Sequence, residues 1–173
     1  MSIKNTKTNI LEKLIEKDHR IFVDTCSLMH PKAKTFFIDT ISYFLQKNNN
    51  RLFIPIEVIR ELNKNLLTRD PIKKHNAKTG KMVINRLREL KLTEERGEKD
   101  DGFVDNLFQV LFTKFRMRYN LCLITQDVGL ANDILKLNRS RSVRKEDDSD
   151  KKIHGYKKDI KVIKIQKNGT AAE

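Results

Sequence analysis

Short apolar runs alternate with longer amphipathic stretches along most of the chain. Residues 20–23 (RIFV), 51–55 (RLFIP) and 121–125 (LCLIT) are short and dense in Ile, Leu and Phe, which is typical of buried strands. Residues 160–165 (IKVIKI) alternate between apolar and charged positions. This alternation predicts a final strand, at the edge of the sheet.

The stretches around these strands carry apolar residues at helical spacing. Helices are predicted at residues 9–17, 34–48, 56–67, 81–90, 102–119 and 128–137. Turns are predicted at residues 69–71 (RDP) and 78–80 (KTG), because Pro and Gly interrupt regular structure. Strands that alternate with helices in this way predict an α/β fold, a three-layer α/β/α sandwich with a central parallel sheet.

One domain accounts for the 173 residues. We assign residues 1–19 to an N-terminal helical extension and residues 20–166 to the domain itself. The domain is expected to carry a basic insert at about 69–99 and a polar basic loop at about 138–158. Residues 167–173 are predicted to form a tail.

The composition is that of a soluble globular chain. No apolar run approaches the roughly 18 residues needed to cross a bilayer, and the first ten residues lack the apolar stretch of a signal peptide. We therefore expect no membrane partner and a cytoplasmic location, with a nuclear location as the alternative in a eukaryotic cell. Cys26 and Cys122 adjoin apolar runs and are expected to be free thiols.

The net charge of +13 is large for this length. The commonest physical meaning of such an excess is attraction to a polyanion, chiefly nucleic acid. An acidic membrane surface is a weaker explanation, because no basic amphipathic helix with aromatic anchors stands out. A basic surface that serves only solubility is the remaining alternative.

Four acidic residues fall near the predicted strand ends or helix starts. Asp24 directly follows the first strand, and Asp127 follows the third. Glu61 lies one turn into the helix after the second strand, and Asp105 lies in the first turn of the helix before the third. Ligands of parallel α/β folds bind outside the carboxyl ends of the strands. Carboxylates gathered there need a compensating cation, which favours a Mg²⁺ or Mn²⁺ site that handles phosphates.

Each acid also has an ordinary structural explanation. Asp24 and Asp127 are suited to capping the helices that follow them. Asp105 in a first helical turn is favourable to the helix dipole, and Glu61 could pair with Lys64 on a solvated helix face.

The four acids lie in motifs that resemble those of the PIN-domain nuclease family. The chain departs from the family pattern at Cys26, where Asn is usual, in its N-terminal helix and in the length of its basic insert. The matching motifs, in order over about residues 20–137, are VDTCSL (Asp24, Thr25, Leu28), FIPIEVIREL (Pro55, Val58, Glu61, Leu62), FVDNLF (Asp105) and LITQDVGL (Thr125, Asp127, Leu130).

The resemblance implies a PIN-like fold over residues 20–166 and a metal-dependent endoribonuclease that leaves 5′-phosphate and 3′-hydroxyl ends. It implies Mg²⁺ or Mn²⁺ as cofactor, held by four residues that are both ligands and catalytic groups: Asp24, Glu61, Asp105 and Asp127. The further assignments are Thr25 and Thr125 as orienting donors, and Asp101 and Asp133 as reserve ligands.

Basic residues of the insert and the late loop are expected to hold the RNA backbone through phosphate contacts. Three alternatives stay open: a non-catalytic PIN-like RNA-binding scaffold in a larger assembly, the toxin of a toxin–antitoxin pair, and a structure-selective DNA nuclease. DNA or a protein partner (an antitoxin or a larger assembly) thus stands beside RNA. The RNA-binding candidates are Lys73, Lys74, Lys78, Lys81, Arg86, Arg88, Arg139, Arg141, Arg144 and Lys145.

Overall fold

The computed structural model describes residues 10–97, 106–139 and 159–173. In this part of the chain six strands form one sheet in the order β3-β2-β1-β4-β5-β6. The first five are parallel to one another, and β6 is antiparallel to β5. The strands are β1 (Arg20–Val23), β2 (Leu52–Pro55), β3 (Thr93–Arg96), β4 (Leu121–Ile124), β5 (Ile160–Ile165) and β6 (Ala171–Ala172).

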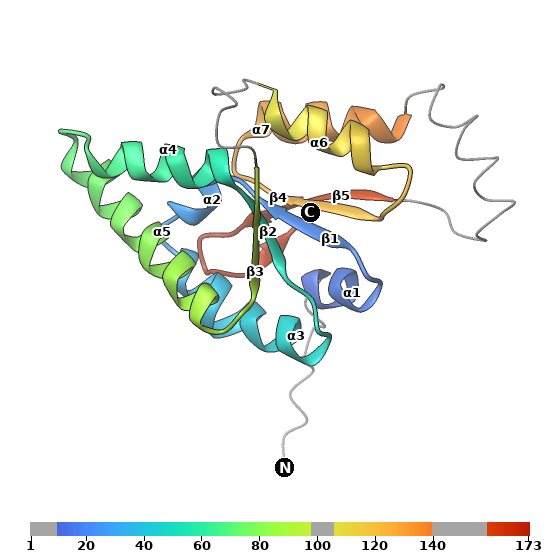
Figure 1. The fold of residues 1–173 in the computed structure, drawn as a ribbon, viewed down its shortest axis with the longest axis horizontal. Helices are drawn as coiled ribbons and strands as arrows, with labels where there is room; N and C mark the ends of the chain where they lie inside the picture. The colour runs from blue at the N-terminus through green and yellow to red at the C-terminus, as the bar shows by residue number, and fades with distance from the viewer. Residues whose placement is uncertain (1–9, 98–105, 140–158) are drawn as a thin grey trace, which may run out of the picture.

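Helices cover both faces of this sheet, so the predicted three-layer α/β/α sandwich is confirmed (Figure 1). On one face lie α1 (Ile10–Glu16), the π-helix Thr35–Ile41 with its continuation α3 (Ser42–Lys47), and α5 (Pro71–Glu89). On the other face lie α6 (Leu107–Phe115) and α7 (Val128–Lys136), which continues into a short 3₁₀ turn, Leu137–Arg139. At the carboxyl edge of the strands lie α2 (Thr25–Leu28) and α4 (Ile56–Leu66).

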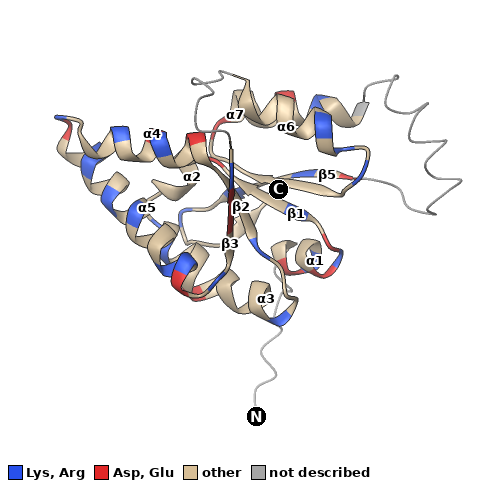
Figure 2. Ribbon diagram, viewed as in Figure 1, with Lys and Arg blue, Asp and Glu red and all other residues tan. Residues whose placement is uncertain are grey.

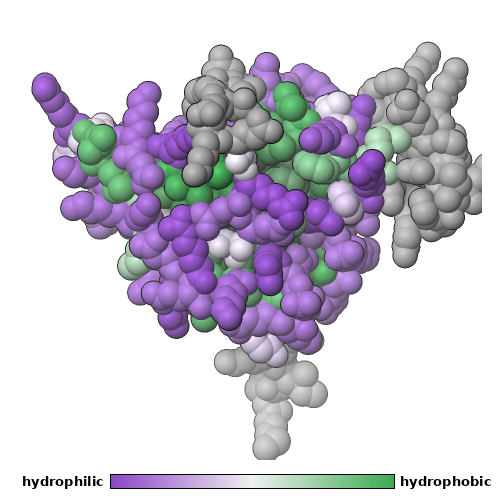
Figure 3. All heavy atoms as spheres, in the orientation of Figure 1, coloured by the Kyte–Doolittle hydropathy of each residue, from purple (hydrophilic) through white to green (hydrophobic). Residues whose placement is uncertain are grey.

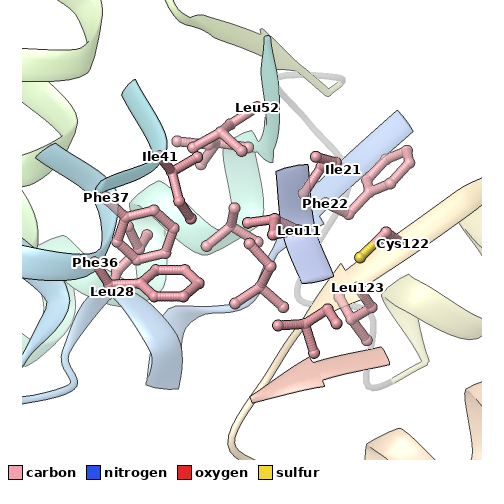
Figure 4. Close-up of a cluster of buried hydrophobic side chains, with 14 of the residues drawn as sticks. Leu11, Ile21, Phe22, Leu28, Phe36, Phe37, Ile41, Leu52, Cys122 and Leu123 are labelled. Atoms are coloured by element: carbon pink, nitrogen blue, oxygen red, sulfur yellow. The ribbon is translucent and has the colours of Figure 1, made fainter. Parts of the chain in front are cut away.

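The core is continuous from α1 through the sheet (Figure 4). Leu11 of α1 is fully buried together with Ile21 of β1 and Leu28 of α2. Helix α1 is therefore part of the domain core and is not an appendage to it. Cys122 of β4 is also fully buried, and both cysteines are free thiols, as the sequence predicts. No helix in the described part of the chain has the length and apolar character to cross a membrane.

The turn predicted at residues 78–80 is wrong, because Gly80 lies inside α5. A Cβ at this position would lie 2.9 Å from the carbonyl oxygen of Leu28 and 3.0 Å from a methyl group of Leu62. Gly80 thus allows α5 to approach α2 and α4 closely, and the glycine serves packing where the sequence indicated a chain reversal.

The ends of the sheet differ from the sequence expectation in two ways. Strand β3 has the sequence TEER, which lacks an apolar pattern because it is an edge strand. The expected tail at 167–173 turns back at Gly169, whose φ is +82°, and forms β6. Strand β6 pairs only with Lys164 and Ile165, so β5 keeps the predicted edge position over residues 160–163 and loses it at its end.

Candidate active site

Asp24 occupies the first position after β1, at the carboxyl edge of the sheet. The parallel register pairs Val23 with Ile124, so the residues that follow the two strands, Asp24 and Thr125, lie side by side. Thr125 Oγ1 donates a hydrogen bond of 2.7 Å to Asp24 Oδ2. Asp24 Oδ1 accepts a 2.6 Å bond from the backbone N–H of Thr25, which caps α2. Asp24 is therefore a helix cap and also a link between two strand-end loops.

Thr125 connects this link to Asp127. Its side chain is fully buried, and Oγ1 also accepts a 3.1 Å hydrogen bond from the backbone N–H of Asp127. Asp127 is exposed and caps α7 by accepting a 3.0 Å bond from the N–H of Leu130. The loop after β4 thus presents one carboxylate to solvent, and its backbone is tied to Thr125.

Thr25 joins Glu61 to the same cluster. The buried Thr25 hydroxyl donates a 2.6 Å hydrogen bond to Glu61 Oε2, and Glu61 is half-buried on α4. The pairing with Lys64 that the sequence left open is not formed. Two threonines thus link the Asp24 and Glu61 side chains and the backbone of Asp127.

Cys26 is the residue at which the first motif departs from the PIN-domain pattern that it resembles. Its thiol donates to Asp24 Oδ2 at 2.8 Å, and its sulfur accepts a 3.3 Å bond from the backbone N–H of Gln126. Burial and the adjacent Asp24 carboxylate raise the pKa of the Cys26 thiol to about 11. The thiol therefore stays protonated near neutral pH and acts as a hydrogen-bond donor to Asp24.

The oxygen donors of this cluster suit a hard divalent cation. A carboxylate offers about four acceptor sites, and the contacts above occupy three of those of Asp24. Glu61 Oε1 and Asp127 Oδ2 accept no hydrogen bond from the described residues. Within those residues, no three His, Cys, Asp or Glu side chains are grouped closely enough to hold a metal ion. Asp101 and Asp105, two of the sequence candidates, lie outside the described residues.

Asp133, the other reserve ligand, lies on the exposed surface of α7. It forms an ion pair of 2.8 Å with Lys136, one turn further along the same helix. The contacts of the cluster do not include Asp133, and its position fits a solvated helix face.

The basic candidates on α5 fall into two groups. Lys73, Lys74 and Lys78 are exposed and have no acidic partner among the described residues. Lys81 donates to the side chain of Asn63, whereas two arginines form ion pairs: Arg86 with Glu89 and Arg88 with Glu95. The side chains of Arg139, Arg141, Arg144 and Lys145 lie outside the described part of the chain.

Sequence reasoning missed Glu57, which is buried in the first turn of α4, one turn before Glu61. An acid in a first helical turn is favourable to the helix dipole and carries no further signal in the sequence. Its surroundings become visible only when β3 and α6 are placed beside α4.

Comparisons with known proteins give a similarity to a solved structure whose function is unknown. No family model and no curated protein matches the chain. Among solved structures, a domain of a functionally unknown protein from Methanocaldococcus jannaschii is similar, with 17% sequence identity and a TM-score of 0.45. The similarity covers 69% of this chain and 86% of that chain.

Proposed function

We propose that the chain is a PIN-like, divalent-metal-dependent endoribonuclease that hydrolyses RNA to 5′-phosphate and 3′-hydroxyl ends. The observation that carries the proposal is the hydrogen-bonded cluster at the carboxyl edge of the sheet, where Thr25 and Thr125 link Asp24, Glu61 and Asp127. This edge is where parallel α/β folds bind their ligands. The order of the motifs along the chain gives independent support.

In this proposal Asp24, Glu61, Asp127 and Asp105 would hold Mg²⁺ or Mn²⁺. When bound, such an ion supplies an activated water and compensates the charge on the leaving 3′ oxygen. Thr125 and Cys26 fix the Asp24 carboxylate by donating to Oδ2, and Thr25 fixes Glu61 by donating to Oε2. Both carboxylates are therefore held in place before any substrate arrives, which lowers the cost of ordering them.

The RNA backbone would lie along the basic surface of α4 and α5. Figure 2 shows Lys and Arg along both helices, which project from the carboxyl edge of the sheet. Because Lys73, Lys74 and Lys78 lack acidic partners in the described chain, they are available to phosphates. Contacts of this kind position a strand without reading its sequence, and they weaken as salt rises.

The test incubates the purified chain with end-labelled single-stranded RNA and DNA, in Mn²⁺ or in EDTA. We expect cleavage of RNA in Mn²⁺ only, and a loss of at least about 100-fold in Asp24→Asn and in Glu61→Gln. Asp39→Asn is the matched control, because Asp39 is an exposed acid on the π-helix and takes no part in the hydrogen bonds of the cluster. Removal of a 5′-phosphate from the products by phosphatase would identify the predicted 5′-phosphate ends.

Equal cleavage by the wild type and Asp24→Asn would refute the catalytic proposal. RNA binding without cleavage, unchanged in Asp24→Asn, would replace it with the non-catalytic scaffold. Cleavage of DNA in preference to RNA would assign the same acids to a DNA nuclease.

A further inference from the structure

A pocket of about 390 Å³ lies on the α6 face of the sheet, beyond the carboxylate–threonine cluster. Its floor is formed by β1 and β2, one side by the edge strand β3 and the other side by α6. No described helix covers β3 on this face, and Figure 3 shows apolar side chains among the hydrophilic ones over α6. Val110 of α6, which lines the pocket, is 56% exposed.

The floor and inner end of the pocket are aromatic. Phe22 and Phe53 stack with their ring centroids 5.2 Å apart, because their strands pair them directly. Phe115 and Tyr119 close the end nearest the start of β1. Aromatic surfaces of this extent bind planar, apolar ligand groups by stacking.

The end at the carboxyl edge of the strands holds an unpaired carboxylate. Glu57 is 8% exposed, lines the pocket and has no hydrogen-bond or ion-pair partner among the described residues. Both of its carboxylate oxygens lie 3.3 Å from the place that a Cβ of Gly97 would occupy, so a larger residue at Gly97 would press against the carboxylate. Because no described residue pairs with this carboxylate, its acceptor sites are available to a ligand that donates hydrogen bonds.

The basic residues of the pocket are also incompletely compensated. Arg96 pairs with Glu94. Arg20 stacks over the ring of Tyr119 at 3.4 Å and, like Lys114, has no acidic partner in the described chain. Both lie toward the end opposite Glu57, since Arg20 begins β1 and Lys114 lies in the last turn of α6. Two uncompensated cations disfavour a cationic ligand and favour an anionic group there.

From these three features we propose that the pocket binds one purine nucleotide unit, with guanine as the preferred base. The base would stack on Phe53 and present its donor edge to Glu57, while its phosphate would lie toward Arg20 and Lys114. Guanine fits best because N1–H and the 2-amino group are two parallel donors on one edge, which match the two oxygens of a carboxylate. Adenine, cytosine and uracil lack this pair of adjacent donors.

The pocket stands on its own residues and does not depend on the proposed nuclease. It adjoins the acidic cluster, because Glu57 and Glu61 are one turn apart on α4, a rise of about 6 Å. A nucleotide in the pocket would therefore lie about one unit of a nucleic-acid chain from the acids. The nucleotide could be free or could belong to RNA, and the experiment below separates the two sources.

The test measures binding by calorimetry in EDTA, so that hydrolysis plays no part. The probes are GMP, AMP and guanosine, and two short oligo-U RNAs that contain a single G or a single A. We expect GMP to bind at least tenfold more tightly than AMP and than guanosine, which lacks the phosphate. Tight binding of the G-containing RNA would identify a nucleotide within a chain, and binding of GMP alone would identify a free nucleotide.

Two variants with matched controls test the location. Glu57→Gln should weaken GMP binding at least tenfold and abolish the preference over AMP, whereas Glu16→Gln on the exposed side of α1 should change neither. Val110→Trp should block the pocket from the exposed side of α6, whereas Thr113→Trp, outside the pocket, should not.

A third variant separates this proposal from the proposed nuclease. Asp24→Asn should bind GMP as tightly as the wild type does, even if it no longer cleaves RNA. The proposal is overturned if no probe binds, if AMP binds as GMP does, or if Glu57→Gln and Val110→Trp bind normally.

Discussion

The loops that follow β1 and β4 are built from the same two residue types, yet they hold their aspartates differently. Asp24 comes directly after its strand, is half-buried and accepts three hydrogen bonds through its side chain. Asp127 comes three residues after β4, is exposed and accepts one. Both aspartates cap a helix, so capping does not account for the difference.

The difference follows from the distance between each acid and the end of its strand. Because β1 and β4 are paired in register, the first residue after each strand faces the other loop. Asp24 and Thr125 occupy these two places and bond to each other. Asp127 lies two residues further along, where α7 already turns it outward. Asp24 therefore stabilises the edge of the sheet and Asp127 stabilises only its own helix.

The largest predicted difference in stability is between Asp24→Ala and Asp127→Ala. Asp24→Ala leaves the buried Thr125 hydroxyl and the Cys26 thiol without their acceptor and removes a cap, which should cost about 3 kcal/mol of unfolding free energy. Asp127→Ala removes a cap alone and should cost about 1 kcal/mol. Urea denaturation of the two variants measures both values. Equal losses of unfolding free energy in the two variants would contradict the different roles of Asp24 and Asp127.

Thr125→Val tests whether one hydroxyl joins the two loops. Valine keeps the shape of threonine but cannot donate to Asp24 or accept from the N–H of Asp127, so we expect a loss of about 2 kcal/mol. In an Asp24→Ala background the same change should cost about 1 kcal/mol, since one of its bonds is already absent. A double-mutant cycle by urea denaturation gives the coupling. Additive losses would contradict a shared hydrogen bond.

The sequence predicts the central strands and their carboxyl edge better than it predicts the two outermost strands of the sheet. The runs that became β1, β2 and β4 are buried on both faces, so their apolar character identifies them without tertiary information. Convergence of Asp24 and Thr125 then follows from parallel pairing. By contrast, β3 and β6 are a charged edge strand and a two-residue strand, and their pairing depends on distant segments that no local pattern reveals.

Single residues with two explanations account for the remaining differences. Gly80 looked like a turn because glycine interrupts helices, but the contact with Leu28 that requires it is 52 positions away in the sequence. Glu57 gave no signal in the sequence, and its place in a pocket lined by β3 and α6 appears only in the structure. Cys26 departs from the PIN-domain pattern that its motif resembles, and the structure shows its thiol donating to Asp24. In each case the surroundings that explain the residue are tertiary and have no local signal in the sequence.

The reactivity of Cys26 should report the charge of Asp24 and not that of Asp127. With a pKa of about 11, the thiolate fraction at pH 8 is about 0.1%, against about a quarter for an ordinary thiol. A more basic thiolate is also a stronger nucleophile, by about tenfold here, which offsets part of the lower thiolate fraction. Alkylation of Cys26 by iodoacetamide should therefore be about twentyfold slower than alkylation of free cysteine. The rate should keep rising with pH toward 11.

Removing the neighbouring charge should accelerate this alkylation. Burial is the main cause of the raised pKa and remains in Asp24→Asn, but the repulsion from the carboxylate is lost, so the rate at pH 8 should increase. Asp127→Asn should leave the rate unchanged. Peptide mapping by mass spectrometry separates Cys26 from the fully buried Cys122. Equal acceleration by both variants would mean that the two aspartates influence the thiol alike.

The smallest effect on stability is predicted for Asp127→Asn, and it separates the two roles of that residue. Asparagine caps a helix about as well as aspartate, so the bond to the N–H of Leu130 persists. The exposed charge at the start of α7 contributes about 0.5 kcal/mol at most, which is the loss expected in urea denaturation. If Asp127 also serves hydrolysis, RNA cleavage in Mn²⁺ should nevertheless fall at least about 100-fold. Unchanged stability with unchanged cleavage would leave Asp127 as a helix cap alone, and Asp24 and Glu61 as the functional acids of the described cluster.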